Sequence, residues 1–145
     1  MKRKLLSLLV VFASIFALNA QTVEGVWQTI DDESGKPRSE VKIFIKNNKL
    51  YGQVTKLYRG PKEEQDPVCT KGSDSRNGKK IIGMLIITGL SKDGSEWEAD
   101  DAIFDPESGK IYDCKVWLDE DNKDLLQVRG YIWTFFRTQT WKRIK

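Results

Sequence analysis

Apolar and polar residues alternate with a period of two along most of the chain after residue 20. The clearest stretch is SEVKIFIKNNKLYGQV, in which alternation runs through 41–46, stops at Asn47-Asn48 and resumes over 50–55. Alternation of this kind is typical of strands with one buried face, and asparagine tolerates the positive φ of a tight turn. The stretch therefore predicts a β-hairpin.

The same test predicts six further strands, at 23–30, 81–90, 96–104, 110–118, 125–131 and 138–144. Short separators such as SKDGS, DPESG and DEDNKD supply the residues that hairpin turns require. No segment from residue 21 onward repeats apolar residues at helical spacing. Eight sequential antiparallel strands leave two open edges unless the sheet closes. We therefore predict an all-β fold, a single eight-stranded antiparallel up-and-down barrel, whose interior is filled by side chains or holds one small ligand.

One connection between the predicted strands is long. It runs over 58–80 and contains Pro61, Pro67 and Cys69 among many charged residues. A loop of this length in a compact domain is usually functional or tethered. Cys69 offers such a tether.

The first twenty residues have the pattern of a secretory signal peptide. Basic residues at 2–4 precede an apolar run over 5–18, and Leu18-Asn19-Ala20 ends on a small residue suited to cleavage. The alternative is a membrane anchor, but the run is shorter than the roughly 18 residues of a spanning helix. We expect residues 1–20 to be removed, leaving a domain at 21–145 that is exported to the periplasm or secreted, without an integral membrane segment.

Removal of the leader makes the chain neutral. The precursor has 24 basic and 21 acidic residues, and the leader takes three basic ones, which leaves 21 of each. The basic surplus typical of nucleic-acid-binding proteins is then gone. The remaining 125 residues (145 − 20) suffice for one domain, which we expect to be a monomer.

The absence of histidine excludes most catalytic arrangements. With no imidazole in the sequence, Ser-His-Asp and Cys-His catalysis and the usual mixed zinc sites are not available. Cys69 and Cys114 are the only cysteines, and an exported pair is expected to form a disulfide. Two buried free thiols are the alternative.

Carboxylates are the remaining candidates for acid–base chemistry. Asp100, Asp101 and Asp105 cluster near one strand end, where a facing pair could hydrolyse a glycosidic bond. However, neighbouring strand residues point to opposite faces, and Asp105 before Pro106 is a common turn opener. The acidic turns do not match calcium-loop spacing. We predict no enzyme activity, no metal site and no cofactor.

Aromatic residues provide the candidate ligand site. They gather on the predicted strands and their ends, at Trp97, Phe104, Tyr112, Trp117, Tyr131 and Trp133. We select Trp97, Phe104, Trp117 and Tyr131 as candidate ligand-binding residues, with Arg129 as an anchor for a carboxylate if it points inward. Filling of the core, and an outward Arg129, are the alternatives. Phe135 and Phe136 fall in a predicted connection, where an exposed apolar pair indicates a barrel mouth or a partner surface.

The sequence Gly25-Val26-Trp27 on the first strand resembles the calycin pattern of lipocalins and fatty-acid-binding proteins. That resemblance implies that Trp27 plugs the closed end of the barrel, with Gly25 allowing a close backbone approach and Arg143, or failing that Arg137, packing over the indole. Seven ordered motifs are similar to domain-of-unknown-function family 2147, small exported bacterial proteins with a lipocalin-like fold. They are GVWQTIDDESGKPRSEVKIF, LYGQV, DPVC, KIIGMLIITGL, IFDPESGKIYDCKV, VRGYI and RTQTWKR.

The family resemblance implies a fold and export, and it brings no established activity. The family often has a second cysteine where this chain has Gly72, which favours pairing of Cys69 with Cys114. We expect a non-enzymatic protein that binds a small apolar or amphipathic ligand in the barrel. The alternative is an interaction module with a packed barrel that uses 58–80, and a carboxylate hydrolase is the third hypothesis.

Overall fold

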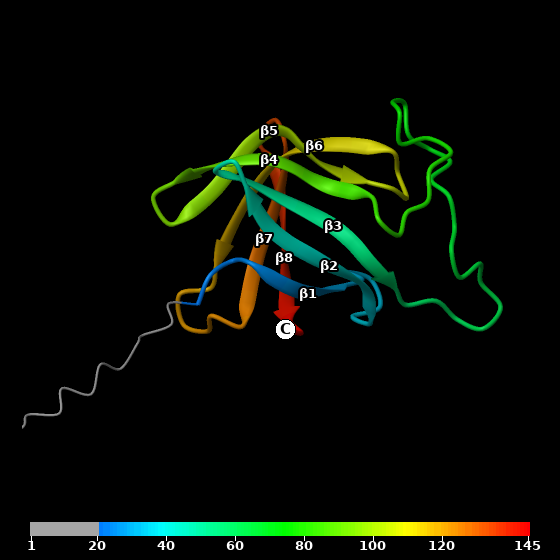
Figure 1. The fold of residues 1–145 in the computed structure, drawn as a ribbon, viewed down its shortest axis with the longest axis horizontal. Coiled ribbons are helices and arrows are strands. Elements are labelled where there is room, and N and C mark those ends of the chain that lie inside the picture. The colour runs from blue at the N-terminus through cyan, green and yellow to red at the C-terminus, as the bar shows by residue number, and fades with distance from the viewer. Residues whose placement is uncertain (1–20) are drawn as a thin grey trace, which may run out of the picture.

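The computed structural model describes residues 21–145, and the predicted signal peptide lies outside them. Eight antiparallel strands form one closed barrel in sequence order, which confirms the fold predicted from the sequence (Figure 1). The strands are β1 (Gly25–Ile30), β2 (Pro37–Lys46), β3 (Lys49–Leu57), β4 (Leu85–Asp93), β5 (Glu96–Asp105), β6 (Lys110–Leu118), β7 (Leu125–Ile132) and β8 (Phe135–Arg143). Within the described residues there is no helix of the length and apolarity needed to span a membrane.

The barrel closes where β1 meets β8. Trp27 is opposite Arg143 in this pair, and the chain end continues the contact. The Val26 amide donates to the Lys145 carbonyl over 2.6 Å, and the Ile144 amide donates to the Val26 carbonyl over 2.7 Å. Closure gives the outer strands backbone partners that an open sheet would leave exposed.

Antiparallel order divides the connections between two ends of the barrel. The closed end carries the β2–β3, β4–β5 and β6–β7 turns, together with residue 25 and the end of β8. The opposite end, here called the mouth, carries the β1–β2, β3–β4, β5–β6 and β7–β8 connections. The long β3–β4 connection lies away from the closed end (Figure 1).

Side chains fill the barrel interior. The inward positions hold three tryptophans, a phenylalanine and a set of aliphatic residues: Trp27, Trp97, Trp141, Phe104, Val41, Ile43, Leu50, Val54, Ile87, Leu90, Val116, Leu126 and Val128. Packing is close at Gly52, where an added methyl group would lie 3.1 Å from both Ile43 and Ile87. An eight-stranded barrel has just enough interior room for its own side chains. In this barrel, that interior space is filled by the core side chains.

Two strands differ in position from the sequence prediction. The fourth strand begins at Leu85 rather than at residue 81, because Ile81 and Met84 end the long connection with their own backbone contacts. The last strand begins at Phe135 rather than at residue 138. Phe135 and Phe136 therefore belong to a strand and not to a connection.

The long β3–β4 connection is mostly exposed, and it packs onto the barrel around Cys69 rather than being held by a disulfide. Val68 and Lys80 form a β-bridge, and the Cys69 amide donates to the Lys79 carbonyl over 2.7 Å. Cys69 is 1% exposed, so this part of the connection contributes to the core. The tether predicted from the sequence is thus the packing of Cys69, while these backbone contacts join one part of the connection to another.

The predicted disulfide is absent: Cys69 and Cys114 are free and buried. Sγ of Cys69 lies 4.0 Å from the carbonyl oxygen of Pro106, in the β5–β6 turn. Cys114 lies within β6 and is 2% exposed.

Both thiols should therefore resist modification in the folded protein. Burial raises the pKa of the Cys114 thiol to about 12, and only the thiolate is nucleophilic. We expect an aromatic disulfide reagent to leave native protein unlabelled at mildly alkaline pH and to label both cysteines in denaturant without added reductant. Failure of the denatured protein to react would show that the two cysteines are bonded.

Candidate functional site

Trp27 and Arg143 occupy the closed end as a stacked pair. Trp27 is fully buried, and its Nε1 donates to the Val23 carbonyl over 2.9 Å. The Arg143 guanidinium carbon lies 4.2 Å from the Trp27 ring centroid. Arg143 also donates to the Glu24 and Thr22 carbonyls over 2.9 and 2.8 Å. This arrangement joins the first strand, the last strand and the segment before β1 at one point.

Gly25 permits the close approach of chain ends at this point. Its φ is +143°, and an added Cβ would lie 2.7 Å from the Lys145 carbonyl oxygen and 2.9 Å from Nη1 of Arg143. A residue with a side chain would push the end of β8 away. Arg137, the alternative partner for Trp27, instead pairs with Asp32.

The candidate ligand-binding residues divide between two faces of the barrel wall. Trp97 and Phe104 point inward and are buried in the core. Trp117, Arg129 and Tyr131 point outward, because each alternates with an inward residue of the same strand, such as Val116 or Val128. These three residues consequently cannot line an interior cavity.

The outward residues form an aromatic strip across β6, β7 and β8, defined here as Trp117, Arg129, Tyr131 and Phe136. The Arg129 guanidinium carbon lies 5.0 Å from the Trp117 ring centroid and 4.4 Å from that of Phe136. Nε of Arg129 donates to Thr138 over 2.7 Å. Cation–π contacts and this hydrogen bond hold the strip in place.

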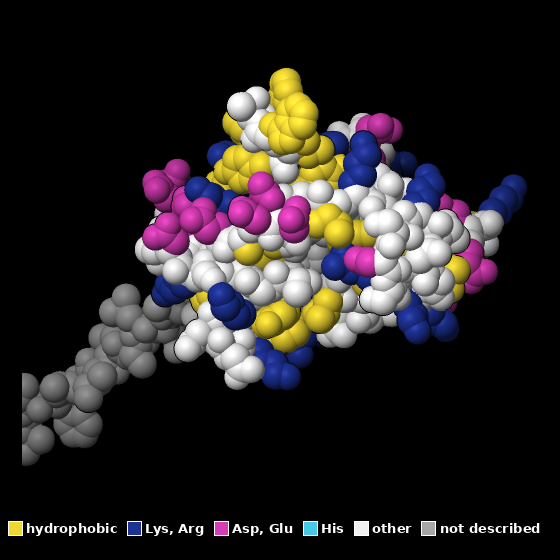
Figure 2. Space-filling view, turned by 90° about the horizontal axis from the view of Figure 1, so that it is seen from above, with side chains coloured by type: hydrophobic (Ala, Val, Ile, Leu, Met, Phe, Trp, Pro, Cys, Tyr) yellow, Lys and Arg dark blue, Asp and Glu magenta, His cyan; other side chains and the backbone are white. Residues whose placement is uncertain are grey.

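The strip continues into an apolar hairpin tip, defined as Ile132, Trp133, Phe135 and Phe136. Trp133 is 93% exposed and Phe135 is 77% exposed. Trp133 also has a φ of +55° in the β7–β8 turn, a backbone conformation that asparagine or glycine adopts more easily. Contiguous exposed apolar patches on a monomer often mark an interaction site. Figure 2 shows a hydrophobic knob projecting beside a band of acidic side chains.

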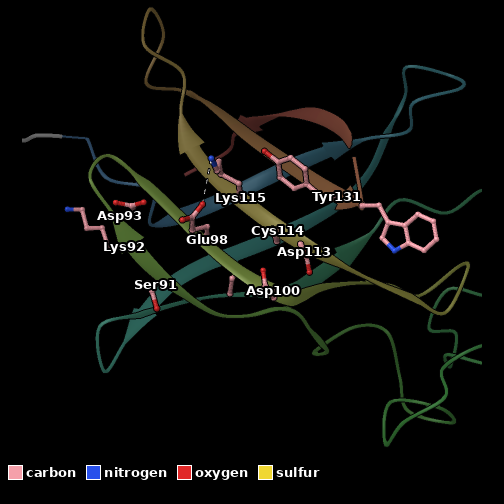
Figure 3. Close-up of a pocket in the computed structure, with 11 residues that line it drawn as sticks. Ser91, Lys92, Asp93, Glu98, Asp100, Asp113, Cys114, Lys115 and Tyr131 are labelled. Atoms are coloured by element: carbon pink, nitrogen blue, oxygen red, sulfur yellow. Dashed lines mark ion pairs between the residues drawn. The ribbon is translucent and has the colours of Figure 1, made fainter. Parts of the chain in front are cut away.

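A hollow of about 700 Å³ lies beside the hairpin tip, on the outer wall of the barrel. We call it the outer groove, and Figure 3 shows its lining from β4, β5, β6 and β7. The lining residues are Ser91, Lys92, Asp93, Glu98, Ala99, Asp100, Asp113, Cys114, Lys115, Tyr131 and Trp133. Its aromatic end is formed by Tyr131 and Trp133, and its other lining is mostly polar.

The outer groove carries a surplus of negative charge. Four carboxylates line it, at Asp93, Glu98, Asp100 and Asp113, against two ammonium groups. One of these, Nζ of Lys115, lies 3.1 Å from Glu96 and 3.6 Å from Glu98, so its charge is already paired. The hydrogen bond with Glu96 raises the pKa of Lys115 above its ordinary value. The groove therefore presents carboxylates to whatever occupies it.

A β-bulge shapes the floor of the groove. The register between β5 and β6 shifts between Ala99 and Ile103, where Asp101 has a φ of +47°. The Asp101 amide donates to Oδ1 of Asp113 over 2.9 Å. Bulges bend a strand and re-aim its side chains. The bulge was not predicted from the sequence, although an Asp-Asp pair within an alternating run is compatible with positive φ.

Two of the three carboxylates considered for hydrolysis, Asp105 and Asp101, have structural roles in a turn and a bulge. Asp105 accepts hydrogen bonds from the Glu107 amide over 3.0 Å and from the Ser108 hydroxyl over 2.8 Å, as a turn opener does. Asp101 occupies the bulge, away from Asp105 along β5. Among residues 21–145, no group of three or more acidic, cysteine or histidine side chains is arranged to hold a metal ion.

The closed eight-stranded antiparallel barrel is a lipocalin-like fold. The chain belongs to the family described as "Uncharacterized protein conserved in bacteria (DUF2147)", whose sequence profile matches residues 25–143. Among solved structures, it is similar to protein HP1028 from Helicobacter pylori, described as belonging to the lipocalin family. That similarity has a TM-score of 0.67 at 21% identity and covers 84% of this chain and 82% of the other. No curated protein matches the sequence.

Proposed function

We propose that this protein is an exported, non-enzymatic interaction module of the bacterial cell envelope. Its binding surface comprises the outer groove and the hairpin tip. The observation that carries the proposal is the contrast between the two sides of the wall: the interior is filled with its own side chains, while Trp133 and Phe135 project into solvent beside a groove. Aromatic residues and arginine are enriched at protein interfaces.

The negative charge of the outer groove indicates what kind of partner it binds. Four carboxylates line the groove beside exposed aromatic rings, and one of them, Glu98, is already paired with Lys115. The complementary partner is therefore a polypeptide segment that carries lysine or arginine among apolar side chains. An anionic lipid surface would be repelled by the same carboxylates. The binding surface shares no residue with the connection 58–80.

A small ligand held inside the barrel is the competing hypothesis. It requires the inward core residues to move aside, and Gly52 shows how little room they leave. Carboxylate hydrolysis has less support, since Asp105 is engaged in its turn. Binding on the outer face needs no rearrangement of the core.

We expect a short peptide that alternates lysine and leucine to bind the protein, and Trp133→Ser to weaken that binding about tenfold, the effect of removing one interface anchor. Asp100→Asn should weaken binding less and reduce its dependence on salt, since that change removes one charge. Fluorescence anisotropy of the labelled peptide measures both effects.

Ile144→Ser is the matched control for this experiment, because Ile144 is exposed but follows β8 at the closed end. It should bind the peptide as the wild type does. A peptide with glutamate in place of lysine should not bind. Equal affinity of both peptides, unchanged affinity of Trp133→Ser, or binding to lipid vesicles alone would refute the proposal.

A further inference from the structure

A second hollow, of about 400 Å³, lies at the mouth within the β3–β4 connection, in the segment that leads into β4. We call it the loop hollow; its lining is Ser75, Arg76, Lys79, Lys80, Ile82, Gly83 and Met84. Three of these side chains are cationic and none is acidic. The hollow thus has the opposite charge to the outer groove and shares no residue with it.

Arg76 is the central group of this hollow. Its guanidinium carbon lies 4.5 Å from the ring centroid of Phe104, which is part of the core. Nη1 of Arg76 is shielded from solvent and has no hydrogen-bond partner within the described residues. Asp74 is the nearest carboxylate partner, at 3.7 Å from Nε. A guanidinium held against an aromatic ring with unused donors is suited to an anion.

The neighbouring cations differ in how far they are already satisfied. Lys80 is paired with Asp66, which raises the pKa of Lys80 above its ordinary value. Lys79 makes no ion pair with any other described residue. Arg76 and Lys79 therefore supply donors for one anionic group at the same hollow.

Apart from Ser75, the remaining lining is apolar, and Met84 connects it with the core. Met84 is 7% exposed and packs with the core residues, while Ile82 is 36% exposed. Gly83 has a φ of +93°, and a Cβ there would meet nothing within 4 Å, so the backbone leaves open space at this edge. The hollow therefore combines a cationic wall with an apolar one.

We infer that the loop hollow is a binding site for an amphipathic anion, a molecule with a carboxylate or phosphate head on a short apolar chain. The head accepts hydrogen bonds from Arg76 and Lys79, and the apolar part lies against Ile82 and Met84. This site is independent of the proposed interaction surface on the outer wall.

The test is calorimetric titration of the full mature chain with laurate. We expect laurate to bind one site, and Arg76→Gln to weaken binding at least about tenfold, as expected when a charge-assisted partner is lost. Arg76→Lys should retain part of the affinity, because the charge remains but the planar fork is lost. A trimethylammonium surfactant with the same chain should not bind.

Arg59→Gln is the matched control, since Arg59 lies in the same connection but pairs with Glu63 and does not line the hollow. It should bind laurate normally, and so should Trp133→Ser. Lys79→Gln, at an exposed position, provides a second test if Arg76→Gln does not fold, and it should also weaken binding. The inference is overturned if laurate does not bind, if the cationic surfactant binds equally well, or if neither hollow variant changes the affinity.

Discussion

Replacing Trp27 with alanine is expected to lower the free energy of unfolding by about 4 kcal/mol, the usual range for a fully buried aromatic residue. The indole is 0% exposed, so its loss leaves a cavity at the closed end. The change also removes the donor to the Val23 carbonyl and the ring beneath the Arg143 guanidinium. Urea denaturation followed by circular dichroism measures the loss.

Trp133→Ala is the matched control for this substitution. The same residue type is removed, but Trp133 is 93% exposed, and substitutions at such positions usually change stability by less than about 0.5 kcal/mol. Trp133→Asn should be at least as stable as the wild type, because asparagine tolerates positive φ. Equal destabilisation by the Trp27 and Trp133 variants would mean that Trp27 does not plug the barrel.

Gly109→Ala is expected to lower the free energy of unfolding by at least about 3 kcal/mol, since left-handed backbone and overpacking both add to the loss. Gly109 lies in the β5–β6 turn with a φ of +73°, and an added Cβ would clash with the carbonyl oxygen of Lys71. That atom belongs to the long connection, so the variant must displace it. Once the connection is displaced, Cys69 should react with the thiol reagent in otherwise folded protein.

Gly94→Ala separates the clash from the backbone effect. Gly94 has a φ of +62°, close to that of Gly109, but a Cβ there would meet nothing within 4 Å. This variant should lose only about 1 kcal/mol, the left-handed penalty alone. It should also leave Cys69 unreactive. Similar losses in the two variants would argue against seating of the connection on the β5–β6 turn.

The barrel was predictable because period-two alternation and turn residues are local signals. Asn47 and Asn48 both have positive φ in the β2–β3 turn, as the hairpin pattern indicated. The side of the wall that each aromatic residue faces was not predictable. Val116 and Trp117 are adjacent and both apolar, so alternation alone does not decide which of them points inward.

The outer groove also could not be predicted from the sequence. Its residues come from four strands, and the bulge at Asp101 that shapes it depends on register with β6. The hairpin tip, in contrast, has a sequence pattern from which an exposed aromatic residue could have been predicted. Ile132 pairs with Phe135 across a two-residue turn, which leaves Trp133 in a position where bulky residues are uncommon. An aromatic residue between two short alternating runs marks such a turn as a candidate contact surface.

We propose that partners bind the outside of this barrel rather than its interior. The five tryptophans test it directly, because Trp27, Trp97 and Trp141 lie in the core, whereas Trp117 and Trp133 lie outside it. Nitrogen-15 NMR resolves each indole N–H while the lysine–leucine peptide is added. We predict that the signals of Trp133 and Trp117 shift and that the three core signals stay in place. Shifts confined to Trp27, Trp97 and Trp141 would contradict binding on the outer face and place the ligand inside the barrel.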